Sequence, residues 1–137
     1  MTIDYDLIWK KVNDAGIILN EFIDSKLNEL KLTDKDLSLV GFSQGTMMSL
    51  HVGLRRNKAM SSIVGFSGRL VREDTLKREM NAKPPIYLIH GDQDPMVPYS
   101  DTINATKILK DLDVNVQSHI SLNTPHSIAQ DGLEIAI

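Results

Sequence analysis

The stretch LVGFSQGTMM, residues 39–48, runs from an apolar segment through a serine into a helical pattern. Its centre, GFSQG, has the G-x-S-x-G spacing that places Ser43 on a sharp strand-to-helix turn, where a serine can act as a nucleophile. Gly41 and Gly45 would let the strand and the helix approach closely, and the backbone N–H of Gln44 would point to a developing oxyanion. The alternative interpretation is a glycine-rich turn whose serine has no chemical role.

The residues on both sides of this turn carry the patterns that a nucleophile turn requires. Residues 37–42 (LSLVGF) are typical of a short buried strand, and a helical pattern follows over residues 44–57. Further upstream, residues 7–30 place apolar side chains three and four positions apart, which predicts an amphipathic helix with Asp4 or Asp6 as its N-cap.

The alternation of strand and helix continues along the chain. Strands are predicted over residues 61–66, 84–91 and 114–122, helices over 71–80 and 99–112, and a last helix from near His126. In VNVQSHISL, the third of these strands, apolar and polar residues alternate, which predicts an edge strand with one solvated face. Strands that alternate with helices indicate an α/β fold of about four parallel strands with helices on both faces.

Composition excludes several classes of function. The chain has 137 residues, enough for one domain, with 42% hydrophobic and 24% charged residues, which is ordinary for a globular protein. A net charge of −3 without a basic stripe argues against nucleic acid as a partner. Because the chain has no cysteine, it has no disulfide, thiolate nucleophile or cysteine-bound metal. With no signal peptide and no membrane span in the sequence, we expect a cytoplasmic protein.

A serine nucleophile needs a base, and four histidines are candidates. Sites in parallel α/β sheets lie beyond the carboxyl ends of the strands, which favours His126 in the loop after the last strand. His51 lies two turns along the helix from Ser43, so we expect a surface or packing role. His90 is expected to have a structural role in its turn, and His119 to be exposed on the edge strand.

The base needs an orienting acid, and the preceding strand is followed by HGDQDPMVP, which offers Asp92 and Asp94. Pro95 stiffens the turn at Asp94, which slightly favours Asp94 as the acid. On this reasoning both aspartates remain candidates. The chain order of serine, aspartate and histidine is that of α/β-hydrolases and differs from that of chymotrypsin and subtilisin. Three such residues at three successive strand ends are more specific than any single motif.

A second serine, Ser67, also follows a strand that ends in Gly-Phe, but its glycine comes at the next position. It either lies beside the site, as a wall or hydrogen-bond donor, or is a plain loop serine. The candidate pocket walls are Phe42, Ser67, Met96 and Val97.

The segments GFSQGT, HGDQDPMVP and PHSI resemble the nucleophile, acid and histidine segments of the phospholipase/carboxylesterase family of serine hydrolases, the relatives of acyl-protein thioesterases. The resemblance spans nearly all of the chain. It implies an α/β-hydrolase fold with Ser43 as nucleophile, Asp94 as acid and His126 as base. It also implies hydrolysis of carboxylic esters or thioesters with short to medium acyl groups, and no cofactor.

The resemblance covers only the C-terminal part of the family's domain, so we expect residues 1–137 to form a single partial domain. The family's preceding strands and the loop that supplies the second oxyanion donor are not matched. One such donor contributes about 10²–10³ in rate, which predicts weak activity. The alternative is a non-catalytic remnant that serves as an oligomerising or binding module. The strand at residues 37–42 would have a bare outer edge, from which we expect a homodimer that covers it.

Overall fold

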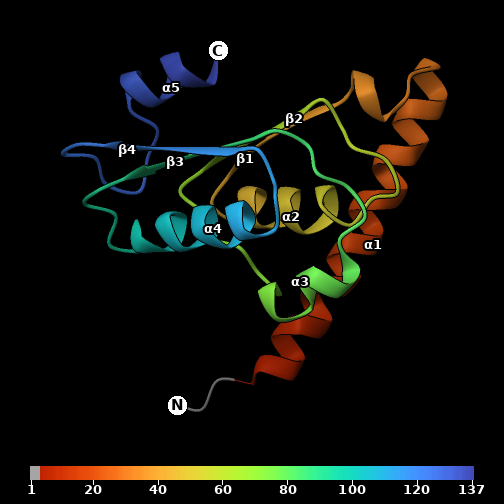
Figure 1. Ribbon diagram of the computed structural model, residues 1–137, viewed down its shortest axis with the longest axis horizontal. Helices are drawn as coiled ribbons and strands as arrows, with labels where there is room; N and C mark the ends of the chain where they lie inside the picture. Colours follow the sequence, from red (N-terminus) through yellow and green to blue (C-terminus); the bar gives the residue numbers. More distant parts are fainter. Residues whose placement is uncertain (1–3) are drawn as a thin grey trace.

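A four-stranded parallel sheet forms the centre of the molecule in the computed structural model, which describes residues 4–137 (Figure 1). The spatial order of the strands is their order in the chain, and every neighbouring pair is parallel. The strands are β1 (Ser38–Phe42), β2 (Ser62–Phe66), β3 (Ile86–Gly91) and β4 (Val116–Ser121). The helices are α1 (Tyr5–Leu30), α2 (Gln44–Gly53), α3 (Glu73–Glu79), α4 (Ser100–Asp111) and α5 (Gln130–Ala136), with a 3₁₀ turn, η1 (Asp34–Asp36). This arrangement confirms the predicted α/β fold.

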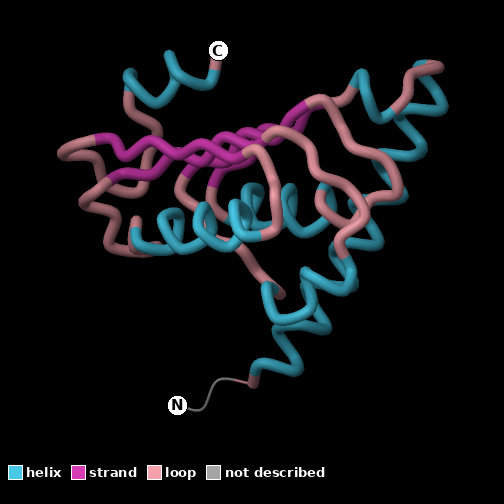
Figure 2. The backbone as a smooth tube through the Cα atoms, viewed as in Figure 1, coloured by secondary structure: helices cyan, strands magenta, loops and turns pink. Residues whose placement is uncertain are grey.

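The two faces of the sheet are covered unequally (Figure 2). Helices α2 and α4 pack on one face, where they enclose the larger core around Leu50, Ile63 and Leu88. Among residues 4–137, only α5 packs on the other face, over β3 and β4, where Ala136 lies on a smaller buried cluster that includes Phe66. Most of the hydrophobic stabilisation therefore comes from one side of the sheet.

Helix α1 begins where the sequence predicts, because the Asp4 side chain accepts the Leu7 N–H at 3.0 Å as an N-cap. The helix lies along α2, and its only buried residues are Gly16 and Ile23. Much of its predicted apolar stripe is exposed, including Phe22. The stripe is exposed because α1 packs mainly against a single helix.

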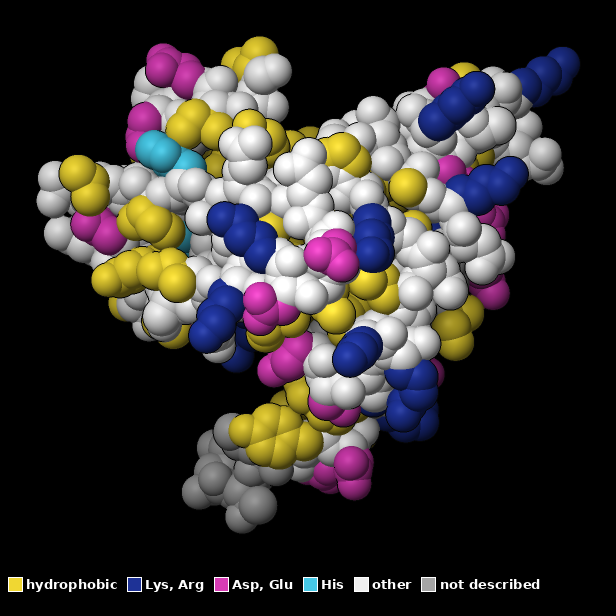
Figure 3. All heavy atoms as spheres, viewed as in Figure 1, with side chains coloured by type: hydrophobic (Ala, Val, Ile, Leu, Met, Phe, Trp, Pro, Cys, Tyr) yellow, Lys and Arg dark blue, Asp and Glu magenta, His cyan; other side chains and the backbone are white. Residues whose placement is uncertain are grey.

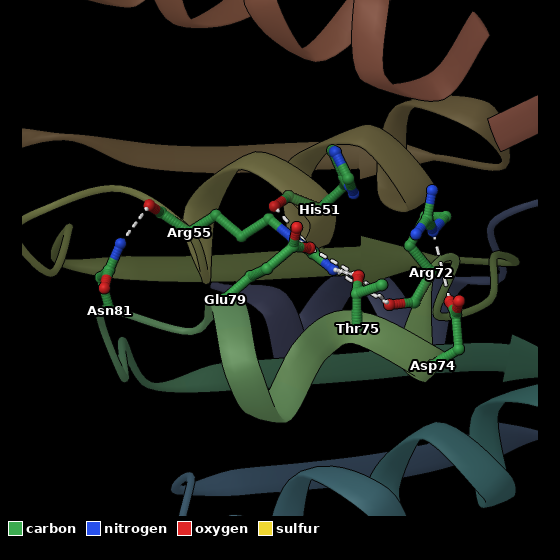
Figure 4. A network of polar contacts seen from close by, with 7 residues as sticks. All are labelled: His51, Arg55, Arg72, Asp74, Thr75, Glu79 and Asn81. Atoms are coloured by element: carbon green, nitrogen blue, oxygen red, sulfur yellow. Dashed lines mark hydrogen bonds and ion pairs between the residues drawn. The ribbon is translucent and has the colours of Figure 1, made fainter. Parts of the chain in front are cut away.

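The junction between α2 and α3 is held by Arg55 (Figure 4). Its guanidinium donates to the carbonyl oxygens of His51 at 3.2 Å and Arg72 at 3.0 Å, and to Glu79 at 3.0 Å. Asn81 in turn donates to the Arg55 carbonyl at 3.1 Å. Helix α2 ends at Gly53, four residues earlier than predicted, and Arg55 satisfies a carbonyl of its last turn.

The outer edge of β1 is unpaired among residues 4–137. Val40 on this strand is 70% exposed and Phe42 is 40% exposed. Figure 3 shows further hydrophobic side chains at the surface below α5 and towards the N-terminal end of α1. That a second copy covers the edge stays a prediction. None of the described helices has the length and apolar character needed to cross a membrane.

Two expectations for the C-terminal region are corrected. Strand β4 is an edge strand as predicted, but its polar face is solvated only in part: Ser121 is buried and His119 half-buried, because α5 packs over them. Helix α5 begins at Gln130 rather than near His126. A tight turn, in which the Ser127 N–H donates to the Pro125 carbonyl, keeps the preceding residues out of the helix.

Candidate active site

Ser43 alone connects β1 to α2, as the G-x-S-x-G motif predicts. Its backbone has φ 56° and ψ −114°, a combination that non-glycine residues rarely adopt and that costs about 1–3 kcal/mol. The Ser43 N–H is fixed by donation to the Phe66 carbonyl on β2 at 2.8 Å. The strained turn projects the side chain from the carboxyl end of the sheet, where it is partly exposed.

The two glycines of the motif are not equivalent. A Cβ atom on Gly41 would collide with the backbone of Gly45 and would lie 2.5 Å from the Thr46 nitrogen, so only glycine fits there. A Cβ atom on Gly45 would enter open space, and its φ is not positive. Gly41 therefore allows the close approach of strand and helix, whereas the structure gives Gly45 no such role.

The amino end of α2 faces the same region. Gln44 is the first residue of this helix, so its N–H has no carbonyl one turn earlier to which it could donate. The helix dipole adds partial positive charge at this end. The Gln44 N–H can therefore donate to an oxyanion that forms at Ser43.

The loops after β3 and β4 bring an aspartate and a histidine to Ser43. The His126 Nε2 atom lies 3.1 Å from the Ser43 Oγ atom, and its Nδ1 atom lies 2.6 Å from the Asp94 Oδ2 atom. The Phe42 ring packs on the imidazole with a centroid distance of 4.9 Å. The three side chains thus form one continuous chain of hydrogen bonds, with the imidazole in the middle.

Asp94 is fixed in a charged state suited to this arrangement. Its Oδ1 atom accepts the backbone N–H groups of Met96 and Val97, both at 2.9 Å. Burial raises the pKa of Asp94, but the Val97 N–H, the bond with His126 and the Met96 N–H together hold this pKa below its usual value of 3.8. The carboxylate is therefore ionised at neutral pH, as stabilisation of an imidazolium requires.

Asp92, the other candidate acid, has a different contact. Its Oδ1 atom accepts the Thr124 N–H at 3.3 Å, and the neighbouring Gln93 N–H donates to the Thr124 carbonyl at 2.9 Å. Asp92 therefore braces the loop that carries His126 and does not contact the imidazole.

Two other histidines have packing roles. His90 is buried, and its Nε2–H donates to the Val97 carbonyl at 2.7 Å while Nδ1 accepts from the Thr102 hydroxyl at 2.8 Å. These contacts support the expected structural role and hold the loop of Asp94. His51 is 6% exposed, so its role is packing rather than surface. Burial lowers the pKa of His51 to about 4, which keeps it neutral at pH 7.

The four predicted pocket walls lie in different surroundings. Phe42 lies on the His126 ring, and Val97 is buried in the loop of Asp94. Met96 is 71% exposed and Ser67 is 1% exposed, and the described residues give the Ser67 Oγ atom no hydrogen-bond partner.

A hollow of about 610 Å³ opens beside Gln44. Its lining is mainly apolar and comes from the first turns of α1, including Trp9 and Val12, and from Met47 and Met48 of α2. Sequence reasoning missed this hollow because its two walls come from separate helices. The exposed part of the predicted apolar stripe on α1 was the available signal.

Comparison with known proteins decides the family. Residues 6–137 match the phospholipase/carboxylesterase family. The chain belongs to this family. The acyl-protein thioesterase 1 of Gibberella zeae is 31% identical over 140 residues, which cover 96% of this chain and 60% of that protein. The acyl-protein thioesterase 1 of Neurospora crassa is 29% identical over 135 residues, which cover 95% of this chain and 49% of that protein.

Solved structures agree with this family assignment. The crystal structure of esterase PE8 superposes with a TM-score of 0.90 and 41% identity, covering 91% of this chain and 58% of that one. A phospholipase/carboxylesterase from Dyadobacter fermentans, at 23% identity and a TM-score of 0.78, shares the fold. The chain spans about half to three fifths of the length of these family members.

Proposed function

We propose that this chain is a serine hydrolase of carboxylic esters or thioesters, with Ser43 as nucleophile, His126 as general base and Asp94 as the acid that orients it. The observation that carries this proposal is the position of the His126 ring, 3.1 Å from the Ser43 hydroxyl and 2.6 Å from the Asp94 carboxylate. Membership of a family whose named relatives are esterases and thioesterases supports the same reaction class.

The mechanism follows from the hydrogen-bond chain. His126 Nε2 takes the hydroxyl proton as Ser43 Oγ attacks the substrate carbonyl, and Asp94 stabilises the resulting imidazolium. The Gln44 N–H donates to the oxyanion of the tetrahedral intermediate. The imidazolium then returns its proton to the leaving alcohol or thiol, which leaves an acyl group on Ser43. Water, activated by His126, hydrolyses this acyl-enzyme and restores the free serine.

The hollow beside Gln44 is the natural place for the apolar part of such a substrate. It begins next to the oxyanion donor and is lined by Met47, Met48 and Trp9. Apolar lining of this kind favours an acyl chain over a polar group. Methionine side chains adapt to chains of different shape, so a range of acyl lengths is expected.

The expected activity is modest. Gln44 is the one oxyanion donor that we assign among residues 4–137, and a second donor would contribute about 10²–10³ in rate. The competing function is a non-catalytic module that associates through the exposed edge of β1, where Val40 is uncovered.

A fluorophosphonate probe separates the two functions, because it reacts with activated serines. We expect stoichiometric labelling of the wild-type protein, with the adduct located at Ser43 by peptide mass spectrometry. Labelling should require a native protein and should disappear after thermal unfolding. A folded protein that stays unlabelled would contradict the hydrolase and support the binding module.

A further inference from the structure

A second histidine–aspartate pair connects the two ends of the segment that carries His126. The His119 Nε2 atom on β4 lies 2.6 Å from the Asp131 Oδ2 atom, in the first turn of α5. The two residues are 12 positions apart, and the whole segment that contains His126 lies between them. The pair thus closes a loop whose only use in the proposed mechanism is to present His126.

The two halves of this loop are held by different means. The first half is fixed at Thr124, which bonds through its backbone to Asp92 and Gln93. The second half leads directly into α5, so its position depends on where that helix sits. Side chains on α5 contribute the pair with His119 and the packing of Ala136.

Helix α5 lies close to the sheet but contacts it over a small area. A Cβ atom on Gly132 would lie 2.8 Å from Ile89 on β3, so the helix backbone lies almost directly on the strands. The helix has seven residues, and its Leu133 and Ile135 side chains are exposed. The position of α5 therefore depends on the contacts that it makes with β3 and β4.

The hydrogen bond between His119 and Asp131 joins a side chain at the start of α5 directly to β4. The bond with His119 lowers the pKa of the Asp131 carboxyl, so the charged form of Asp131 is the bonded one. The bond also has a fixed direction, which the apolar contacts of α5 lack.

We propose that His119 is a positioning residue for His126: by holding Asp131 it fixes the start of α5 and therefore the second half of the His126 loop. This inference rests on the function proposed above. Misplacing a reacting group by 1 Å can lower the rate about 10²-fold. A loop whose second half is not held in place would therefore lower the rate of the chemical step without removing the site.

The test compares two replacements of His119. His119→Phe keeps a ring of similar size but has no donor, whereas His119→Gln keeps an N–H donor that can reach Asp131. We expect His119→Phe to lower the rate constant of fluorophosphonate labelling, and kcat for p-nitrophenyl butyrate, by about ten-fold, with KM within about two-fold. His119→Gln should retain most of the wild-type rate, which a role in bulk packing would not predict.

Two further variants make the result specific. Glu134→Gln changes another hydrogen-bonded carboxylate of α5, whose partner Gln130 lies on the same helix, and should react like the wild type. Asp131→Ala breaks the pair from its more exposed side and should match His119→Phe. Asp131→Ala also tests the pair if His119→Phe fails to fold.

The outcomes distinguish this inference from the proposed function. If the wild type is not labelled, the proposed function fails and this inference fails with it. If the wild type is labelled and both His119→Phe and Asp131→Ala react within about two-fold of it, only the positioning role is overturned. Equal losses in His119→Phe and His119→Gln would also overturn it, because the donor would then be irrelevant.

Discussion

Strands β1 and β2 both end in Gly-Phe, and each is followed by a serine at which the chain turns sharply. Ser43 has φ 56° and Ser67 has φ 54°. Each serine N–H donates at 2.8 Å to a carbonyl of the next strand, Phe66 for the first turn and Ile89 for the second. The Ser43 side chain nevertheless reaches His126, whereas the Ser67 side chain is buried and has no hydrogen-bond partner within residues 4–137. The same tripeptide, with nearly the same positive φ at its serine, thus gives two different environments.

The residues that follow each serine explain the difference. Helix α2 begins directly after Ser43, so the N–H of its first residue, Gln44, lies beside the turn. After Ser67 comes Gly68, and α3 begins only at Glu73. A Cβ atom on Gly68 would lie 2.5 Å from Thr46 and 3.1 Å from the Ser43 carbonyl oxygen. The second turn therefore packs beneath the first and supports it.

The largest expected effect separates the two serines by activity. Ser43→Ala removes the nucleophile and should lower p-nitrophenyl butyrate hydrolysis by at least about 10³-fold, to background. Ser67→Ala is the matched control at the neighbouring strand end, and it should keep hydrolysis within about three-fold of the wild type. Hydrolysis that survives Ser43→Ala would contradict Ser43 as the nucleophile, and hydrolysis that is lost in a folded Ser67→Ala protein would contradict Ser67 as an inert control.

The next effect concerns the glycines around Ser43. Gly41→Ala forces a methyl group into the backbone of the following helix and should destabilise the fold by about 3 kcal/mol or more. Gly45→Ala adds a methyl group in open space within a helix and should stabilise the fold by about 0.5–1 kcal/mol. Urea denaturation followed by circular dichroism measures both. Similar losses for the two variants would contradict the asymmetry of the turn.

A smaller effect tests how the two turns support each other. The Thr46 hydroxyl donates to the Phe66 carbonyl at 2.8 Å and so joins α2 to the end of β2. Thr46→Val removes this bond and should cost about 1 kcal/mol, because the Phe66 carbonyl still accepts the Ser43 N–H. It should also lower kcat, since the helix that carries Gln44 loses an anchor.

The control for Thr46 is Thr106→Val on α4. The Thr106 hydroxyl is also buried and donates to a carbonyl at 2.8 Å, that of Thr102, but it lies away from the turns. Its stability loss should be similar and its kcat unchanged. If both variants reduce kcat equally, Thr46 has no special part in holding the turn.

Local patterns were sufficient to predict the parts of the site that depend on strand ends. The apolar runs and the helices between them predict the parallel sheet, and a parallel sheet collects the segments of Ser43, Asp94 and His126 at one edge. The choice between Asp92 and Asp94 was beyond local pattern, because both follow the same strand. It depends on the loop path that turns Asp94 towards His126 and Asp92 towards Thr124.

Features that depend on contact between distant segments could not be predicted. The open space beside Gly45 depends on the direction in which α2 leaves the turn. The hollow needs α1 and α2 together, and the half-buried state of His119 needs α5 folded back over β4. In each case the sequence shows one side of the contact only, and a polar residue on an edge strand looks exposed until its partner is known.

The smallest expected effect concerns the stability of the second turn. The Ser67 Oγ atom is buried with no hydrogen-bond partner among the described residues, so no protein group there replaces the hydration that folding removes. Ser67→Ala deletes this oxygen and leaves the positive φ and the packing of Gly68 unchanged. We expect the urea midpoint to stay the same or to rise by the equivalent of about 1 kcal/mol. A loss of more than about 1 kcal/mol would mean that the Ser67 hydroxyl has a partner in solution, and the second turn would then resemble the first more closely than its burial indicates.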